Sequence, residues 1–234
     1  MEVGILAVEF DVMLSLDGVP MLMHDQQLLR TVTADCSYRG KVFNTLTAED
    51  LRTIDVGSWY GNRYSNERIP TLDSVIEYCI EHNIFMNIEI KPVDGDEVRT
   101  GRVVANTVKQ YFDLLEQRHL VPLFSSFCFD ALKAAKDTFA DVPRGYLMKE
   151  PLHNMPQWED RLRELDAVSA HLNHKHVTKD QIDALHSMGF GVFCYTVNDV
   201  SRARELLEMG LDAFCTDEVE LFKDLARQLN GELS

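Results

Sequence analysis

The chain has 234 residues and a formal net charge of −15, so nucleic acid and anionic lipid are poor partners except at a local basic pocket. Apolar residues make up 45% of the chain, enough for a core, but no run of about 18 apolar residues offers a stable membrane-spanning helix. The five cysteines are scattered without a Cys-x-x-Cys pair, and no signal peptide is visible, so we expect reduced thiols in a cytoplasmic protein.

The opening segment, residues 7–14, alternates as a β-strand does. Val8 and Phe10 share one face, whereas Glu9 and Asp11 share the other. Two carboxylates on one face of an apolar strand need partners, because burying an unpaired charge is costly. This face is therefore a candidate site.

A turn at residues 15–18 and a short strand at residues 20–23 are predicted next. Together with the opening strand they would form a β-hairpin. The hairpin would fold His24 back over the acids. A lone histidine is more often a solvated or core residue, but this position favours general acid/base catalysis. The polar, turn-rich segment 25–68 indicates an inserted lobe above the first strand, and residues 71–82 are predicted to be that unit's helix.

Short apolar strands then alternate with amphipathic helices to the end of the chain. The predicted strands are residues 84–90, 121–125, 144–148, 167–171, 190–195 and 213–216. The predicted helices are residues 99–116, 130–139, 156–165, 178–187, 200–209 and 219–229. This alternation favours a parallel sheet and gives about seven βα units, one short of a (β/α)₈ barrel. A doubly wound sheet is the alternative, but no Gly-x-Gly-x-x-Gly follows the first strand.

The strand predicted at residues 84–90 places Glu89 on the same face as Lys91. If both acidic faces point into a barrel mouth, Glu9, Asp11 and Glu89 converge. Three such carboxylates repel one another unless a cation joins them, and hard oxygen ligands suit Mg²⁺ or Ca²⁺. Ordinary salt bridges at strand ends are the alternative. Lys91 would neutralise the cluster or bind a substrate anion, unless it is only a structural partner.

A group of histidines, His171, His174 and His176, is similar in composition to a metal site. Its spacing is loose, so we favour a structural role for these side chains.

A series of short motifs also runs along nearly the whole chain. They are Val8-Glu9-Phe10-Asp11-Val12, Asp17-Gly18-Val19-Pro20, His24-Asp25, Arg30-Thr31, Asp55-Val56-Gly57-Ser58-Trp59, Ile69-Pro70-Thr71-Leu72, Asn87-Ile88-Glu89-Ile90-Lys91-Pro92, Ser125-Ser126-Phe127, Tyr195-Thr196-Val197-Asn198 and Thr216-Asp217. In this order they resemble the glycerophosphodiester phosphodiesterase family. Leu172-Asn173-His174-Lys175 is similar to the cytosolic bacterial form of the enzyme.

The resemblance implies a TIM barrel that hydrolyses a small-molecule glycerophosphodiester to sn-glycerol 3-phosphate and an alcohol, in glycerophospholipid and glycerol metabolism. It implies one divalent cation, Mg²⁺ or Ca²⁺, bound by Glu9, Asp11 and Glu89. It further implies that His24 is the acid/base residue and that Lys91 contacts the phosphate. Tyr195, a position that is often tryptophan in the family, would line the glycerol side of the pocket.

The start of the chain departs from the family pattern. The family begins with a strand ending in His-Arg-Gly, followed by a Pro-Glu-Asn-Thr segment and a helix. This chain has neither motif, and its residues 1–4 are similar to the C-terminal end of that helix. The missing histidine would be the partner of His24. We therefore expect one domain over residues 1–234, a TIM (β/α)₈-type barrel lacking its first βα unit.

Three explanations of this start are open: a start codon assigned too far downstream, which we favour, a true truncation, or a first strand supplied by another chain. The main functional hypothesis is a metal-dependent phosphodiesterase. The alternative is a catalytically impaired barrel that binds glycerophosphodiesters or a protein partner.

Overall fold

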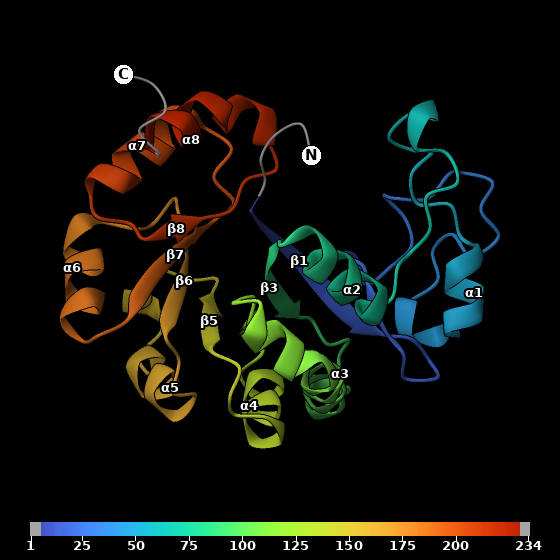
Figure 1. Cartoon of the computed structure of the whole chain (residues 1–234), viewed down its shortest axis with the longest axis horizontal. Coiled ribbons are helices and arrows are strands. Elements are labelled where there is room, and N and C mark those ends of the chain that lie inside the picture. The colour runs from blue at the N-terminus through green and yellow to red at the C-terminus, as the bar shows by residue number, and fades with distance from the viewer. Residues whose placement is uncertain (1–5, 230–234) are drawn as a thin grey trace. The chain divides into compact units, whose positions relative to one another are not determined.

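The computed structural model describes residues 6–229, so the helix end expected at residues 1–4 lies outside them. Contacts within the chain define two compact units, an N-terminal unit, Leu6–Pro143, and a C-terminal unit that begins at Arg144. Each unit combines parallel strands with helices, as the alternating pattern predicted (Figure 1). The expectation of a single domain stays a prediction.

The N-terminal unit contains a sheet with the strand order β2-β1-β3-β4. Its strands are β1 (Ala7–Leu14), β2 (Pro20–Leu22), β3 (Phe85–Ile90) and β4 (Leu123–Ser126). Its helices are α1 (Ala48–Thr53), α2 (Leu72–His82), α3 (Glu97–Gln117) and α4 (Phe129–Thr138). β2 runs antiparallel to β1, whereas β1, β3 and β4 are parallel. The parallel pairs bring the C-terminal ends of these three strands to one edge of the sheet.

The hairpin of β1 and β2 is confirmed, with Val12 opposite Leu22. Its turn requires Gly18, because the backbone there has a φ of 83°, which favours glycine. The Asp17 carboxylate accepts a hydrogen bond from the Ala48 backbone N–H at 2.9 Å. The turn is thus tied to the start of α1, which connects the hairpin to the lobe.

The lobe at residues 25–68 has a hydrophobic core of its own that continues into the hairpin. It buries Leu28, Phe43 and Leu51 against Met13 and Met21. The lobe lies beyond the C-terminal end of β1 (Figure 1). It also contains α1, which is only six residues long and was not recognised in the sequence as a separate helix.

The C-terminal unit contains four parallel strands in the order β5-β6-β7-β8. They are β5 (Arg144–Met148), β6 (Ser169–Asn173), β7 (Gly191–Tyr195) and β8 (Ala213–Phe214). The helices are α5 (Trp158–Glu164), α6 (Lys179–Ser187), α7 (Val200–Glu208) and α8 (Lys223–Leu229). The helix expected over residues 219–229 begins instead with a 3₁₀ turn at Val219–Phe222.

Local signals set the ends of these helices. Thr178 forms a capping box with Gln181 at the start of α6, as its position before the helix predicted. Gly210 follows α7 with a φ of 98°, a backbone conformation that ends helices. Within residues 6–229, no helix is both long and apolar enough to cross a membrane.

His171 on β6 is fully buried and belongs to the core of the C-terminal unit. Its ring stacks on Phe193 at 4.6 Å between centroids, and its Nε2 lies 3.0 Å from the Ser169 hydroxyl. Gly145 makes room for the ring, because a Cβ there would lie 2.1 Å from the same Nε2. Burial lowers the pKa of His171 to about 3, so it is neutral in the folded protein. In the described part of the chain, no cluster of three metal-binding side chains includes His171, His174 or His176.

The buried neutral state of His171 predicts acid sensitivity of folding. The folded-state pKa is about 3 and the unfolded value is 6.5. The contribution of His171 to the free energy of unfolding is therefore fully present above pH 6.5. It is lost as pH falls from 6.5 toward 3, at about 1.4 kcal/mol per pH unit. The free energy of unfolding should be measured with urea at about pH 7.5 and about pH 5. The intact chain should lose ~2 kcal/mol more between these two pH values than the His171→Gln variant does. Equal losses in the two proteins would contradict the assignment.

Candidate functional site

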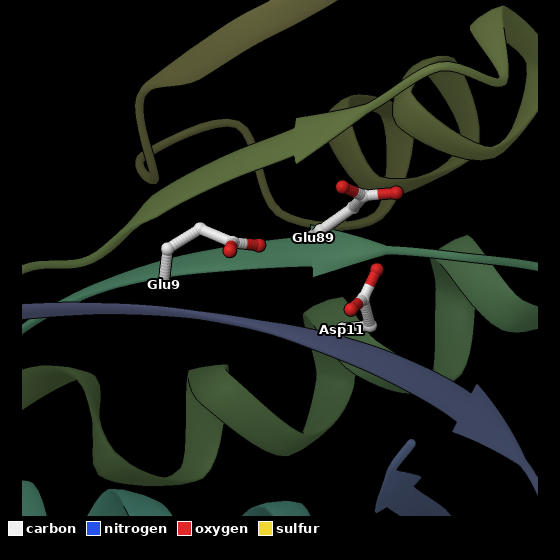
Figure 2. A group of neighbouring side chains, drawn as sticks. All are labelled: Glu9, Asp11 and Glu89. Atoms are coloured by element: carbon white, nitrogen blue, oxygen red, sulfur yellow. The ribbon is translucent and has the colours of Figure 1, made fainter. Parts of the chain in front are cut away.

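Three carboxylates come together on β1 and β3. The parallel register pairs Asp11 with Glu89 and Glu9 with Asn87, so these side chains share one face of the sheet. Carboxylate oxygens of Glu9, Asp11 and Glu89 all lie within 4.8 Å of one another. Figure 2 shows the three side chains gathered along the two adjacent strands. The predicted convergence is therefore present.

The electrostatics of this cluster are unfavourable without a cation. Glu89 is 8% exposed, and burial together with the charges of Asp11 and Glu9 raises its pKa to about 8, against the lowering effect of Lys91. The Lys91 ammonium donates to Asp11 Oδ1 at 2.9 Å, so one lysine faces three acids. A divalent cation would remove the remaining repulsion.

Two further oxygen atoms beside the cluster are suited to a divalent cation. Asn87 Oδ1 and Ser125 Oγ are buried without a hydrogen-bond partner among residues 6–229. Asn87 is opposite Glu9, and Ser125 is opposite Glu89 on β4. Buried polar atoms are usually satisfied, so orphaned oxygens next to three carboxylates indicate a place for a hard cation.

The residues on either side of His24 are hydrogen-bonded to the strands that carry the cluster. The Met23 N–H donates to the Asp11 carbonyl at 3.2 Å, and the Gln26 side chain donates to the Pro92 carbonyl at 3.2 Å. The segment between them is thus fastened to β1 and to the loop after β3. The His24 side chain is 66% exposed, and its Nδ1 lies 2.7 Å from Asp25 Oδ1. An accessible imidazole with a carboxylate partner is suited to proton transfer.

Tyr195 is the one predicted site residue in the C-terminal unit. It ends β7, and its hydroxyl donates to the Met148 carbonyl at 2.8 Å. The other five predicted residues belong to the N-terminal unit. Within that unit the structure joins Glu9, Asp11, Glu89 and Lys91 directly, and His24 through the hairpin.

Sequence reasoning assigned no role to four further residues: Asn87 and Ser125 beside the cluster, and Asp25 and Arg30 in the contacts of His24. Asn87 shares the Glu89 face by simple alternation, so that signal was present. Ser125 required the register of β3 and β4, which short strands do not reveal. Asp25 and Arg30 lie in loops, where no periodicity indicates which side chains meet.

Comparison with known proteins identifies the family. A sequence model of the glycerophosphoryl diester phosphodiesterase family matches residues 1–221. This chain belongs to that family. Members of the family are phosphoric diester hydrolases, and the chain is an enzyme of that class.

Named relatives agree with the family assignment. A glycerophosphodiester phosphodiesterase of Caldanaerobacter subterraneus subsp. tengcongensis is 27% identical, over 97% of this chain and 88% of the relative. A glycerophosphodiester phosphodiesterase of Bacillus altitudinis is also 27% identical, over 97% of this chain and 86% of its own length.

A solved structure agrees in fold. A phosphodiesterase of Oleispira antarctica, in complex with the product sn-glycerol-3-phosphate, is 32% identical with a TM-score of 0.83. The match covers 98% of this chain and 87% of that protein. The fold class is therefore the α/β, TIM-barrel type of glycerophosphodiester phosphodiesterases, as predicted from the sequence.

The acidic cluster predicts metal binding that depends on Glu89. Calorimetric titration with Mg²⁺ and with Ca²⁺ should show affinity reduced at least ~10-fold in Glu89→Gln and lost when Glu9, Asp11 and Glu89 are all alanine. Glu81→Gln is the matched control, because it removes the same charge from an exposed position on α2. Unchanged affinity in the triple variant would exclude this cluster as the metal site.

Proposed function

We propose that the protein hydrolyses glycerophosphodiesters to sn-glycerol 3-phosphate and an alcohol, with one divalent cation, Mg²⁺ or Ca²⁺, at the acidic cluster. The observation that carries this proposal is the cluster of three carboxylates, with Glu89 buried, at adjacent parallel strands of a chain in this family. The Oleispira antarctica neighbour, solved with sn-glycerol-3-phosphate, supports the product.

Each member of the cluster has a defined part in this proposal. Glu9, Asp11 and Glu89 would hold the cation, which when bound polarises the phosphate and neutralises charge that develops on it. Lys91 would donate to the phosphate. In a chain with a net charge of −15, an anionic substrate needs a local positive charge. The Lys91 side chain is 24% exposed, so such a substrate can reach its ammonium group.

His24 would transfer the proton that the reaction moves. Its imidazole is exposed, and the segment that carries it is hydrogen-bonded to β1 and to the loop after β3, so the ring can exchange a proton with a ligand there. Tyr195 would line the glycerol side of the pocket. Its place at the C-terminal end of β7 supports this, since TIM barrels carry their active sites at that end of the strands.

We also propose that the reaction serves glycerophospholipid and glycerol metabolism in the cytoplasm. No disulfide joins the five cysteines, all of which lie within residues 6–229. Reduced cysteines support a reducing compartment.

The proposal predicts metal-dependent turnover of glycerophosphocholine by the intact chain. Release of sn-glycerol 3-phosphate, measured with a coupled enzymatic assay, should stop after EDTA treatment and return with Mg²⁺ or Ca²⁺, because the cluster needs its cation. Binding of glycerophosphocholine without turnover under either metal would favour the alternative, a barrel that binds its ligand without hydrolysing it.

The role of Lys91 predicts a separation of substrate binding from metal binding. Lys91→Ala should weaken glycerophosphocholine binding roughly 10-fold or more, because a hydrogen bond to a charged group contributes about 1.5–3 kcal/mol. Calorimetry should show metal affinity within about threefold of the parent, given that the lysine is not a ligand. The control is Lys179→Ala, which removes a lysine paired with Asp183 on the surface of α6. Unchanged substrate affinity would leave Lys91 as a structural partner of Asp11.

A further inference from the structure

Two motifs outside the acidic cluster are linked to His24 by successive contacts. Asp25 contacts the imidazole, Arg30 contacts Asp25, and the loop at residues 55–59 contacts Arg30. We propose that Asp25 is a positioning residue for His24, and that Arg30 and this loop hold Asp25 in place. The inference rests on the proposed role of His24 as the acid/base residue.

The first contact sets the proton position on the imidazole. His24 Nδ1 lies 2.7 Å from Asp25 Oδ1. An ionised carboxylate only accepts hydrogen bonds, so the neutral His24 ring carries its proton on Nδ1. Nε2 is then the nitrogen that accepts and returns a proton during the reaction. A side chain that is 66% exposed would otherwise sample other orientations and the other tautomer.

Arg30 makes Asp25 a fixed partner. Its Nε donates to Asp25 Oδ2 at 3.0 Å and its Nη2 donates to Asp25 Oδ1 at 3.2 Å. Such a fork constrains the plane of the carboxylate as well as its position. Partial burial acts to raise the pKa of Asp25, but the hydrogen bonds and charges of Arg30 and His24 outweigh it, and the pKa lies below its usual range. Asp25 is therefore ionised at neutral pH.

Arg30 is in turn supported by Trp59. The guanidinium carbon lies 5.7 Å from the centre of the indole ring, and the indole N–H donates to the Val56 carbonyl at 2.8 Å. A guanidinium over an aromatic face is attracted by the ring quadrupole. Trp59 thus limits the movement of an arginine that is 54% exposed.

The loop that carries Trp59 is organised by Asp55. Its carboxylate accepts hydrogen bonds from the backbone N–H groups of Gly57, Ser58 and Asn66, at 2.8 to 2.9 Å. These hydrogen bonds hold the pKa of Asp55 well below its usual range. Gly57 is required, because a Cβ there would lie 2.0 Å from the Tyr64 carbonyl oxygen. A continuous series of contacts therefore runs from this loop through Arg30 and Asp25 to His24.

The elements to which the His24 segment is hydrogen-bonded carry charged groups of their own. β1 carries Glu9 and Asp11, and the segment from β3 to Pro92 carries Glu89 and Lys91. Asp25 differs from them in touching the imidazole directly. A merely structural Asp25–Arg30 pair on the lobe surface would leave the tautomer and titration of His24 unchanged, which makes the two roles separable.

The first test measures the tautomer and the titration midpoint of the His24 ring by NMR, and it does not depend on catalytic activity. Long-range ¹⁵N–¹H spectra of the intact chain, with His24 assigned from its absence in His24→Gln, should show the Nδ1–H tautomer. Asp25→Asn should shift the ring toward the other tautomer and lower its titration midpoint by roughly half a pH unit or more, because a carboxylate stabilises the imidazolium. Asp25→Glu should restore the midpoint in part. An unchanged tautomer and midpoint in Asp25→Asn would overturn the proposal.

The second test is a kinetic cycle with glycerophosphocholine and saturating Mg²⁺. Asp25→Asn should lower kcat roughly 10- to 100-fold with KM within about threefold, a smaller loss than removal of a buried triad carboxylate causes. Arg30→Gln should act in the same direction with a smaller loss. In a His24→Gln background both substitutions should change kcat less than about twofold, since residues that act as one unit are not additive.

The outcomes separate this inference from the proposed function. Full activity in His24→Gln would contradict the acid/base role itself, whereas an equal cost of Asp25→Asn with and without His24 would overturn only the positioning role. Asp212→Asn is the matched control, because Asp212 makes a comparable contact with His186, at 2.8 Å, in the C-terminal unit. It should change the spectrum of His186 and leave kcat unchanged.

Discussion

The site depends on the parallel, in-register pairing of β1 with β3. This pairing sets Asp11 directly opposite Glu89 and places Glu9 one step earlier on the same face. A shift of one residue in either strand would turn its carboxylates to the opposite face, because side chains alternate along a strand. The same ladder leads to Ser125 on β4 and, through the hairpin, to the segment that carries His24. The three carboxylates, the lysine and the segment that carries the histidine are therefore positioned by one set of backbone hydrogen bonds.

That arrangement concentrates negative charge in a protein that already carries −15. Burial and two neighbouring acids raise the pKa of Glu89 to about 8, and Lys91 offsets only part of this effect. Such a cluster is destabilising in isolation and becomes favourable when a cation binds, so the residues are better explained by ligand binding than by folding. His171 shows the opposite solution in the C-terminal unit. It is buried without charge, packed on Phe193 in space provided by Gly145.

The inserted lobe links structure to function in a different way. Its core is continuous with the β1–β2 hairpin, and its loops bring Arg30 and Trp59 to the side of His24 that bears Asp25. The partner of the exposed histidine is its neighbour Asp25, which Arg30 holds and which the more distant Trp59 supports through Arg30.

The sequence by itself determined the order of strands and helices apart from α1, the acidic face of β1, the matching face of β3 and the family resemblance. These follow from local alternation, capping residues and short motifs, as at Thr178 and Gly210. Only the tertiary structure decided that Ser125 joins the acidic row and that Arg30 holds Asp25. It also decided that His171 is a core residue, which lies in no cluster of three metal-binding side chains within residues 6–229. The physical reason is that strand register, loop-to-loop contacts and burial arise between segments far apart in the chain, where periodicity carries no information.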